Sequence, residues 1–259
     1  MGKCRAARTC RTGIDALLAV AIAPRCVACA APLDAPLDGP VCESCWRGVQ
    51  PLAPPLCRTC GDPLPSWRVI SVALEQCSRC RRSPHVLSAA RAAGNYEGTL
   101  RDILHAFKYD GRRSLARPLG VMMRAAGADL LHDAHCVVPV PLHLWRRLRR
   151  GFNQAGELAA HIGVPVVHAL WRTRATRPQT GLPAAARRRN VAGRAFTLSP
   201  FLSPNVQKQW LVDRIVVLVD DVRTTGATLD ACAAVLLSAG AREVRGLTVA
   251  RAAPPVTRA

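Results

Sequence analysis

The chain has 259 residues, of which 49% are hydrophobic, and a formal net charge of +19. A chain of this length and composition can bury one sizeable core and carry a small second module, which excludes an intrinsically disordered protein. No stretch reaches the roughly 18 to 20 consecutive apolar residues of a membrane span. The excess of arginine and lysine suits partners that carry phosphate, either a diphosphate or a nucleic-acid backbone.

The first apolar run, Ile14 to Ala23, follows a basic segment and has the length of a signal-peptide core. Asp15 interrupts this run, and closely paired cysteines follow it, which argues against export. We interpret residues 1–24 as an N-terminal helical extension that docks on the cysteine-rich segment. A signal peptide is the alternative interpretation.

Eight of the twelve cysteines form four C-x-x-C pairs between residues 25 and 82, namely Cys26/Cys29, Cys42/Cys45, Cys57/Cys60 and Cys77/Cys80. Each C-x-x-C turn places two thiolates on one side of a tight knuckle, and two knuckles complete a tetrahedral zinc site. The segment therefore predicts a double zinc ribbon that holds two structural Zn²⁺ ions. The simplest arrangement joins the first two pairs on one ion and the last two on the other, and an interleaved arrangement stays open.

Disulfides, a redox-active pair and an iron–sulfur cluster are the alternatives to zinc. A redox pair would need a C-x-x-C that opens a helix within a βαβ unit, and none of the four pairs has this context. Zinc-bound thiolates need a reducing compartment, so we expect a cytoplasmic protein. Of the other cysteines, Cys136 and Cys232 are expected in the core, and Cys4 and Cys10 are ordinary thiols.

Residues 88–259 show the alternating strands and helices of an α/β domain with a parallel sheet. Three strands are predicted at Cys136 to Val140, Ile215 to Val219 and Val244 to Ala250. After the first of these strands, the basic loop Pro141 to Asn153 leads into a helix that begins near Asn153. A basic loop that opens a helix is suited to binding pyrophosphate.

The most informative motif follows the second strand. Asp220 and Asp221 come at its end, where a parallel sheet places its binding crevice, and neither carboxylate is buried cheaply without a partner. The turn Thr224, Thr225, Gly226, Ala227 and Thr228 supplies hydroxyls and backbone N–H groups before a predicted helix, Leu229 to Ala239, which Gly240 ends. The motif therefore predicts a ribose-phosphate site, and an ordinary strand-turn-helix is the alternative.

This motif resembles the binding signature of type I phosphoribosyltransferases for phosphoribosyl pyrophosphate (PRPP). The resemblance implies that Asp220 and Asp221 hold the ribose hydroxyls as catalytic-site residues, and that residues 224–228 bind its 5′-phosphate. It also implies that Mg²⁺ accompanies the pyrophosphate. Arg223 falls at a position that this family leaves variable, so its only expected role is attraction of an anion.

Five sequence blocks occur in the order typical of ComF-type proteins and narrow the resemblance to this family. The resemblance extends from about Ile14 to Arg251. The blocks are the cysteine pairs, FKYDGRRSLARPLG (107–120), VPVPLHLWRRLRRGFNQA (138–155), TRATRPQTGLPAAARRRNVAGRAF (173–196) and LVDDVRTTGATL (218–229). These are double-zinc-ribbon, phosphoribosyltransferase-like proteins linked to bacterial DNA uptake. The resemblance implies a protein that binds PRPP with Mg²⁺ and transfers phosphoribosyl to an unknown acceptor. The alternatives are an accessory protein that binds single-stranded DNA and a helicase partner, and a salvage enzyme for a purine or pyrimidine. The oligomeric state stays open.

The same resemblance assigns further PRPP-binding candidates, namely Arg150, Gly151, Asn153, Gln154 and Lys108. Lys108 is equally well explained as a solvated lysine. The arginine-rich stretch from Arg172 to Asn190 is the expected counterpart of a lid, with an ordinary surface loop as the alternative. Three aromatic residues are either stacking platforms or core residues, namely Tyr96, Trp145 and Trp171, and His143 is a proton donor or a structural histidine.

Overall fold

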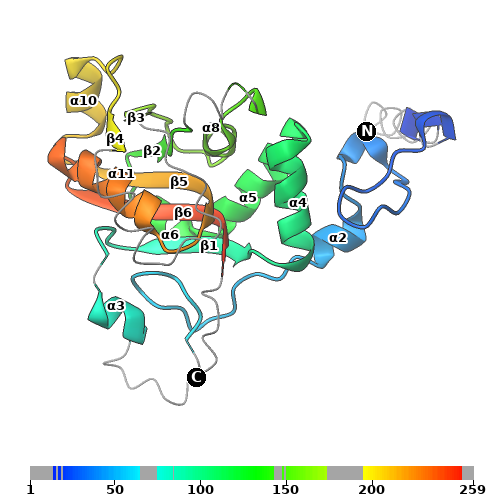
Figure 1. The fold of residues 1–259 in the computed structure, drawn as a ribbon, viewed down its shortest axis with the longest axis horizontal. Coiled ribbons are helices and arrows are strands. Elements are labelled where there is room, and N and C mark those ends of the chain that lie inside the picture. Colours follow the sequence, from blue (N-terminus) through cyan, green and yellow to red (C-terminus); the bar gives the residue numbers. More distant parts are fainter. Residues whose placement is uncertain are drawn as a thin grey trace, which may run out of the picture.

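The computed structural model describes residues 14–15, 17–18, 20–64, 75–83, 85–142, 148, 150–173 and 195–252. Within these ranges, a twisted parallel sheet of four strands forms the centre, with helices against both of its faces (Figure 1). The segments that carry the cysteine pairs lie at its periphery. The expected fold class, a parallel-sheet α/β domain preceded by a double zinc ribbon, is confirmed.

The strand order in the sheet is β1-β6-β5-β2, and every neighbouring pair is parallel. The bounds are β1 (Ala90–Asn95), β2 (Cys136–Pro139), β5 (Ile215–Arg223) and β6 (Glu243–Arg251). Three of these strands agree with the predicted ones. However, β5 continues four residues past Val219, because its pairing with β6 extends to Arg223 opposite Arg251. Asp220 and Asp221 therefore lie inside the strand, near its C-terminal end, rather than after it.

Both faces of the sheet are buried, as expected for apolar parallel strands. Val217 and Val219 of β5 pack into a core formed with α4 (Gly98–Tyr109), α5 (Ala116–Ala126) and α8 (Gln154–Ala159). Val216 and Leu218 pack on the opposite face against α11 (Ala227–Ser238). Cys136 and Cys232 are fully buried in this second core, as predicted.

Smaller elements extend the sheet beyond β2. Val137 of β2 donates its N–H to Pro165 O (2.8 Å) and accepts from Val167 N (2.9 Å), so residues 165–167 follow the edge strand. An antiparallel hairpin and a short helix come next, namely β3 (Leu170–Arg172), β4 (Phe196–Leu198) and α10 (Pro204–Trp210), whose N-cap is Ser203. The other short helices are η1 (Pro36–Asp38), α2 (Glu43–Arg47), α3 (Ser78–Arg82), η3 (Arg113–Leu115) and α6 (Ala128–Leu131).

The two cysteine-rich knuckle pairs attach to the α/β domain at different places, with α2 beyond α4 and α3 on another side (Figure 1). Around the first pair, Leu33 and Val41 join the same buried cluster as Leu100 of α4. The second pair approaches β1 through its backbone, because Thr59 O accepts the N–H of Ala90 (2.6 Å). Gly61 makes this approach possible, since a Cβ at this position would collide with the carbonyl oxygen of Ala90.

The described residues between 14 and 22 are helical, as the sequence predicts. Asp15 is buried and accepts a hydrogen bond from Leu37 N (2.9 Å), which joins this helix to the first knuckle pair. None of the helices in the described ranges combines the length and apolarity that a membrane crossing requires.

Candidate functional site

The eight paired cysteines form two clusters of four thiols. Within each cluster the Sγ atoms lie within 4.8 Å of one another, and the clusters are Cys26, Cys29, Cys42, Cys45 and Cys57, Cys60, Cys77, Cys80. The structure thus has the consecutive arrangement and not the interleaved one. The described cysteines are free thiols, and the cross-pair Sγ distances of 3.7 Å (Cys29 to Cys42, Cys60 to Cys77) are far from a disulfide bond.

Backbone N–H groups point at these sulfurs and favour their thiolate form. Cys26 Sγ accepts from Ala28 N (3.5 Å) and Cys42 N (3.4 Å), and Cys57 Sγ accepts from Cys77 N (3.3 Å). Burial acts to raise the pKa of Cys57, but N–H donors from Cys60 and Cys77 outweigh it and lower this pKa to about 7. Four clustered cysteine sulfurs are the donor set of a structural Zn²⁺ site, so the residues fit two zinc ions.

The predicted phosphate loop lies between β5 and α11. Gly226 has φ of +85°, a left-handed conformation that favours glycine, and it is the N-cap of α11. Ala227 N donates to Thr225 Oγ1 (3.4 Å). The first N–H groups of α11, which runs for 12 residues, point toward this loop and give it the positive end of the helix. The predicted loop residues therefore come together at one helix N-terminus.

The two acids of the motif point to opposite faces of β5, because successive residues of a strand alternate. Asp221 lies on the α4 side, where its Oδ1 is 3.1 Å from Lys108 Nζ, and both side chains are less than one-sixth exposed. Asp220 lies on the α11 side, where its charge acts on the buried Cys232 thiol. The Lys108 side chain is therefore mostly buried rather than solvated. Its charge already neutralises the Asp221 carboxylate, so a ligand would have to share Lys108 with Asp221.

The ionisation of Asp220 is strongly perturbed. Burial and the neighbouring charge of Asp221 raise its pKa from 3.8 to about 7, although Asp221 N donates to its Oδ1 (2.8 Å) and Lys108 and Arg172 act in the opposite direction. A buried carboxyl group whose pKa is raised toward neutrality is a candidate for proton transfer. This shift depends on how deeply the folded chain buries Asp220, which no local sequence pattern specifies.

The predicted pyrophosphate-loop residues lie at the C-terminal end of β2, next to β5. Val140 N donates to Val219 O (2.9 Å), which places this loop beside the acids. Arg150 donates to Gln154 Oε1 (3.2 Å) and to the Tyr109 hydroxyl (3.3 Å). Tyr109 follows Lys108 on α4, so consecutive residues of one helix end contact both halves of the predicted site. Gly151 O accepts from Arg113 Nη2 (2.8 Å), and Asn153 Nδ2 donates to Val140 O (3.3 Å).

Several residues that the sequence suggested for the site lie away from it or outside the described residues. His143, Trp145 and lid residues 174–190 lie outside the described residues. Tyr96 packs at the edge of the α4 core, with Lys108 Nζ 5.6 Å from its ring centre. Trp171 lies on β3, with 37% of its surface exposed.

A cluster of one aspartate and three arginines lies beside the C-terminal end of β5, and the sequence did not predict it. The Asp62 carboxylate pairs with Arg79 of the second knuckle pair (2.6 Å), with Arg223 at the end of β5 (2.7 Å) and with Arg251 at the end of β6 (3.1 Å). Arg223 also donates to Cys60 O (2.6 Å), and its side chain is 3% exposed. Arg223 is therefore a buried anchor between the second knuckle pair and the sheet, not an exposed anion attractor.

The linker after the second knuckle pair also contacts the phosphate loop. Asp230 in the first turn of α11 accepts from Val86 N (3.1 Å), and its other oxygen is 3.0 Å from His85 Nδ1. The His85 ring lies within ordinary contact distance of the Gly226 position. The segment that connects the second knuckle pair to β1 therefore holds the phosphate loop and the start of α11 in place.

The chain is similar to known proteins over most of its length. A double zinc ribbon domain family matches residues 17–81. Competence protein F of Haemophilus influenzae is 30% identical over 238 residues, which cover 88% of this chain and 97% of that protein. DNA utilization protein YhgH of Escherichia coli is 30% identical over 219 residues, covering 79% and 87% of the two chains. A solved hypoxanthine phosphoribosyltransferase from Staphylococcus aureus matches with a TM-score of 0.32 and 11% identity over 57% of this chain and 76% of that chain.

The match to Competence protein F spans both parts of the molecule, because it covers 88% of the chain. The two Cys4 clusters precede the parallel-sheet domain along the chain, which is the order of the five sequence blocks. The chain therefore belongs to the ComF family of competence proteins.

Proposed function

We propose that this protein binds PRPP with Mg²⁺ at the C-terminal ends of β2 and β5 and transfers its phosphoribosyl group to an acceptor. The observation that carries the proposal is the meeting of the motif acids, the left-handed Gly226 turn and the N-terminus of α11 at one end of β5. In this proposal the α11 N-terminus and the hydroxyls of Thr224, Thr225 and Thr228 bind the 5′-phosphate.

The basic groups of the neighbouring elements would hold the diphosphate. Arg150 precedes α8 and donates to Gln154 at its start, and Lys108 approaches from α4. Mg²⁺, when bound with PRPP, would neutralise charge that develops on the departing diphosphate. The acids would orient the ribose, and Asp220 can hold or release a proton near neutral pH. For this to occur, Asp221 must exchange part of its contact with Lys108 for contact with the sugar.

The test is calorimetric titration of PRPP with Mg²⁺ into zinc-loaded full-length protein. We expect saturable binding that Asp221→Asn abolishes, whereas the matched control Asp213→Asn, at the exposed start of the same strand region, leaves it unchanged. Because Asp221→Asn leaves the mostly buried Lys108 ammonium without its partner, urea unfolding of this variant is measured in parallel to separate loss of binding from loss of folding. Tight PRPP binding by Asp221→Asn would refute the assignment of Asp221.

A second candidate function, single-stranded DNA binding as a competence accessory protein, is favoured by the net charge of +19. Two similar proteins carry names that refer to competence and to the use of DNA, namely Competence protein F and DNA utilization protein YhgH. Arginine-rich surfaces bind phosphate backbones with an affinity that falls steeply with salt. DNA binding that weakens with salt and survives the double replacement of Asp220 and Asp221 by Asn would support this function. A helicase partner and a cytoplasmic location stay part of this second proposal.

A further inference from the structure

A largely buried histidine, His85, contacts the start of α11 from the segment that precedes β1. Its side chain is 14% exposed, and its Nδ1 lies 3.0 Å from Asp230 Oδ2. A carboxylate only accepts hydrogen bonds, so Nδ1 is the donor of this pair. The other ring nitrogen, Nε2, is buried without a hydrogen-bond partner among the described residues. The contact with Asp230 is therefore the only hydrogen bond that the described part of the chain gives this ring.

Asp230 places a negative charge at the helix end that we assign to the phosphate. It lies in the first turn of α11, and its Oδ2 is 3.8 Å from the point where a Cβ on Gly226 would stand. A carboxylate at this place interacts favourably with the positive end of the helix dipole, but it repels an anion that binds at the same end. Phosphate binding at Gly226 therefore requires that the charge of Asp230 face away from the loop.

Residues 85–87 hold both oxygens of the Asp230 carboxylate. Oδ1 accepts from Val86 N (3.1 Å) and Leu87 N (3.4 Å), while Oδ2 accepts from His85 Nδ1. The Asp230 side chain is 23% exposed, so these donors replace much of the water that a surface carboxylate would have. Only the contact with His85 involves a side chain, which makes it the one that a single substitution can remove.

The His85 ring also occupies the space behind Gly226. Its Cε1 and Nδ1 atoms lie 3.6 Å and 3.7 Å from the position of a Cβ on Gly226. The left-handed conformation of Gly226 (φ of +85°) determines how the first N–H groups of α11 are directed. One ring therefore lies against the turn and holds the nearest carboxylate.

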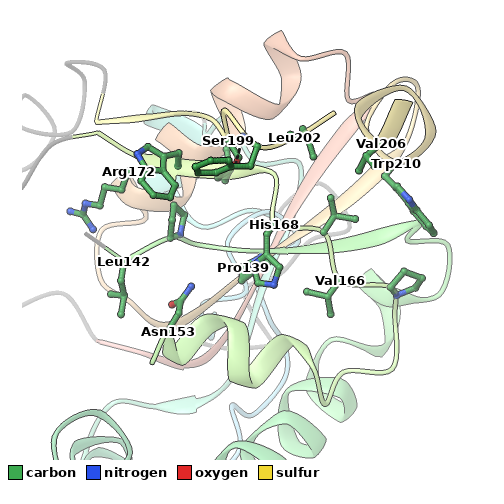
Figure 2. A pocket seen from close by; sticks show the side chains of 16 residues that line it. Pro139, Leu142, Asn153, Val166, His168, Arg172, Ser199, Leu202, Val206 and Trp210 are labelled. Carbon is green, nitrogen blue, oxygen red and sulfur yellow. Dashed lines mark hydrogen bonds between the residues drawn. The ribbon is translucent and has the colours of Figure 1, made fainter. Parts of the chain in front are cut away.

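The large cavity at the other edge of the sheet does not take part in this contact. Figure 2 shows its walls, among them Asn153, His168 and Trp210. None of the described residues that line it belongs to the segment 85–87 or to the turn 224–230. A change at His85 leaves these walls intact, so its effect on phosphate binding would arise at Asp230 and Gly226.

We propose that His85 is a positioning residue for the phosphate loop, which holds the Asp230 carboxylate against residues 85–87 and away from the bound 5′-phosphate. The proposal rests on the proposed function, in which residues 224–228 bind this phosphate of PRPP. His85 does not touch the ligand and acts through Asp230. Without the ring N–H, Asp230 Oδ2 is free to turn toward the start of α11, where its charge repels the anion.

The experiment is calorimetric titration of zinc-loaded full-length protein with two probes, ribose 5-phosphate and inorganic pyrophosphate with Mg²⁺. The first probe carries the 5′-phosphate and the second represents the diphosphate. We expect His85→Leu to weaken ribose 5-phosphate binding by about tenfold, because a hydrogen bond to a charged group is lost, and to leave pyrophosphate binding unchanged. Unchanged ribose 5-phosphate binding would overturn the proposal. Equal weakening of both probes would also overturn it, since it would indicate damage to the whole site.

A conservative variant separates the hydrogen bond from the bulk of the ring. His85→Asn keeps an N–H donor near the position of Nδ1, and it gives up no other hydrogen bond of the ring within the described structure. We expect it to bind ribose 5-phosphate nearly as tightly as the parent protein. The matched control is His132→Leu, at an exposed histidine that follows α6 and precedes β2, and it should change neither affinity. A loss with His85→Asn as large as that with His85→Leu would overturn the role of the hydrogen bond.

A double replacement tests whether His85 acts through Asp230. Asparagine at position 230 has no charge to direct, so His85→Leu/Asp230→Asn should regain most of the affinity that His85→Leu loses. A double variant as weak as His85→Leu would show that the ring acts by filling space, and it would overturn the proposal. Failure of the parent protein to bind either probe would instead reject the proposed function, and this inference with it.

Discussion

Replacement of Asp62 by Asn tests how the second knuckle pair is attached to the α/β domain. The Asp62 carboxylate contacts three arginines within 3.1 Å, and its side chain is only 13% exposed. Burial acts to raise the pKa of Asp62, but the charges of Arg223, Arg251 and Arg79 outweigh it and keep the pKa below its ordinary value. The carboxylate is therefore fully charged at neutral pH, and its contribution to stability is present there.

The expected loss of stability follows from the burial of Arg223. Asparagine has nearly the volume of aspartate, so the change removes the charge without creating a cavity. Removal of one partner of a buried ion pair destabilises by about 3 to 5 kcal/mol, because the remaining charge is left uncompensated. Arg223 keeps its hydrogen bond to Cys60 O, so we expect a loss near the lower limit, about 3 kcal/mol.

The assay is urea unfolding of zinc-saturated protein at neutral pH, with bound zinc measured in parallel to separate loss of metal from loss of the ion pairs. The matched control is Glu75→Gln, which removes the partner of Arg58 (3.1 Å) in a pair whose side chains are 77% and 57% exposed. Exposed pairs contribute about 0 to 1 kcal/mol. If Asp62→Asn loses no more stability than Glu75→Gln, the cluster is not an anchor and the reasoning fails.

Three further predictions concern the pH dependence, the metal and the core. Because the folded pKa of Asp220 (about 7) exceeds its ordinary 3.8, the folded chain binds more protons between these values, so the free energy of unfolding falls by about 1.4 kcal/mol per pH unit up to about pH 7 and levels off above it. Urea unfolding from about pH 5 to about pH 8 should show this fall, and Asp220→Asn should remove it. Cys57→Ser should release one of two zinc ions and increase hydrogen exchange at residues 224–230. Unchanged exchange at these residues would show that the second knuckle pair does not hold the phosphate loop in place. Phe107→Ala, at a fully buried position against Phe152, should lower the free energy of unfolding by about 3 to 5 kcal/mol, and a loss below about 1 kcal/mol would contradict the packing described.

The strands that the sequence predicted are those with continuous apolar, β-branched runs, such as Ile215 to Val219. The sequence did not predict β1, because Ala90–Asn95 reads Ala-Arg-Ala-Ala-Gly-Asn and has little intrinsic strand preference. Its conformation comes from pairing with β6, as in Ala92 opposite Thr248. The extension of β5 through Asp220 has the same origin, since only the partner strand determines where a parallel ladder ends.

The candidate site was predictable where it is local in sequence. Residues 220–228 form a contiguous motif, and the spacing of the eight cysteines indicated their two clusters. Contacts between distant residues were not predictable, including Lys108 with Asp221 and Arg223 with Asp62. These contacts depend on which helix end or knuckle comes to lie beside the C-terminal end of β5, which no local pattern specifies.

The four-residue ion cluster around Asp62 also determines how this chain can be divided. A fragment that starts at residue 88 would keep Arg223 and Arg251 at the strand ends but lose their carboxylate, and it would also uncover Leu100 where the first knuckle pair packs. We therefore expect the second knuckle pair and the ends of β5 and β6 to fold and unfold together, across the boundary that the sequence suggests between the metal-binding module and the α/β domain.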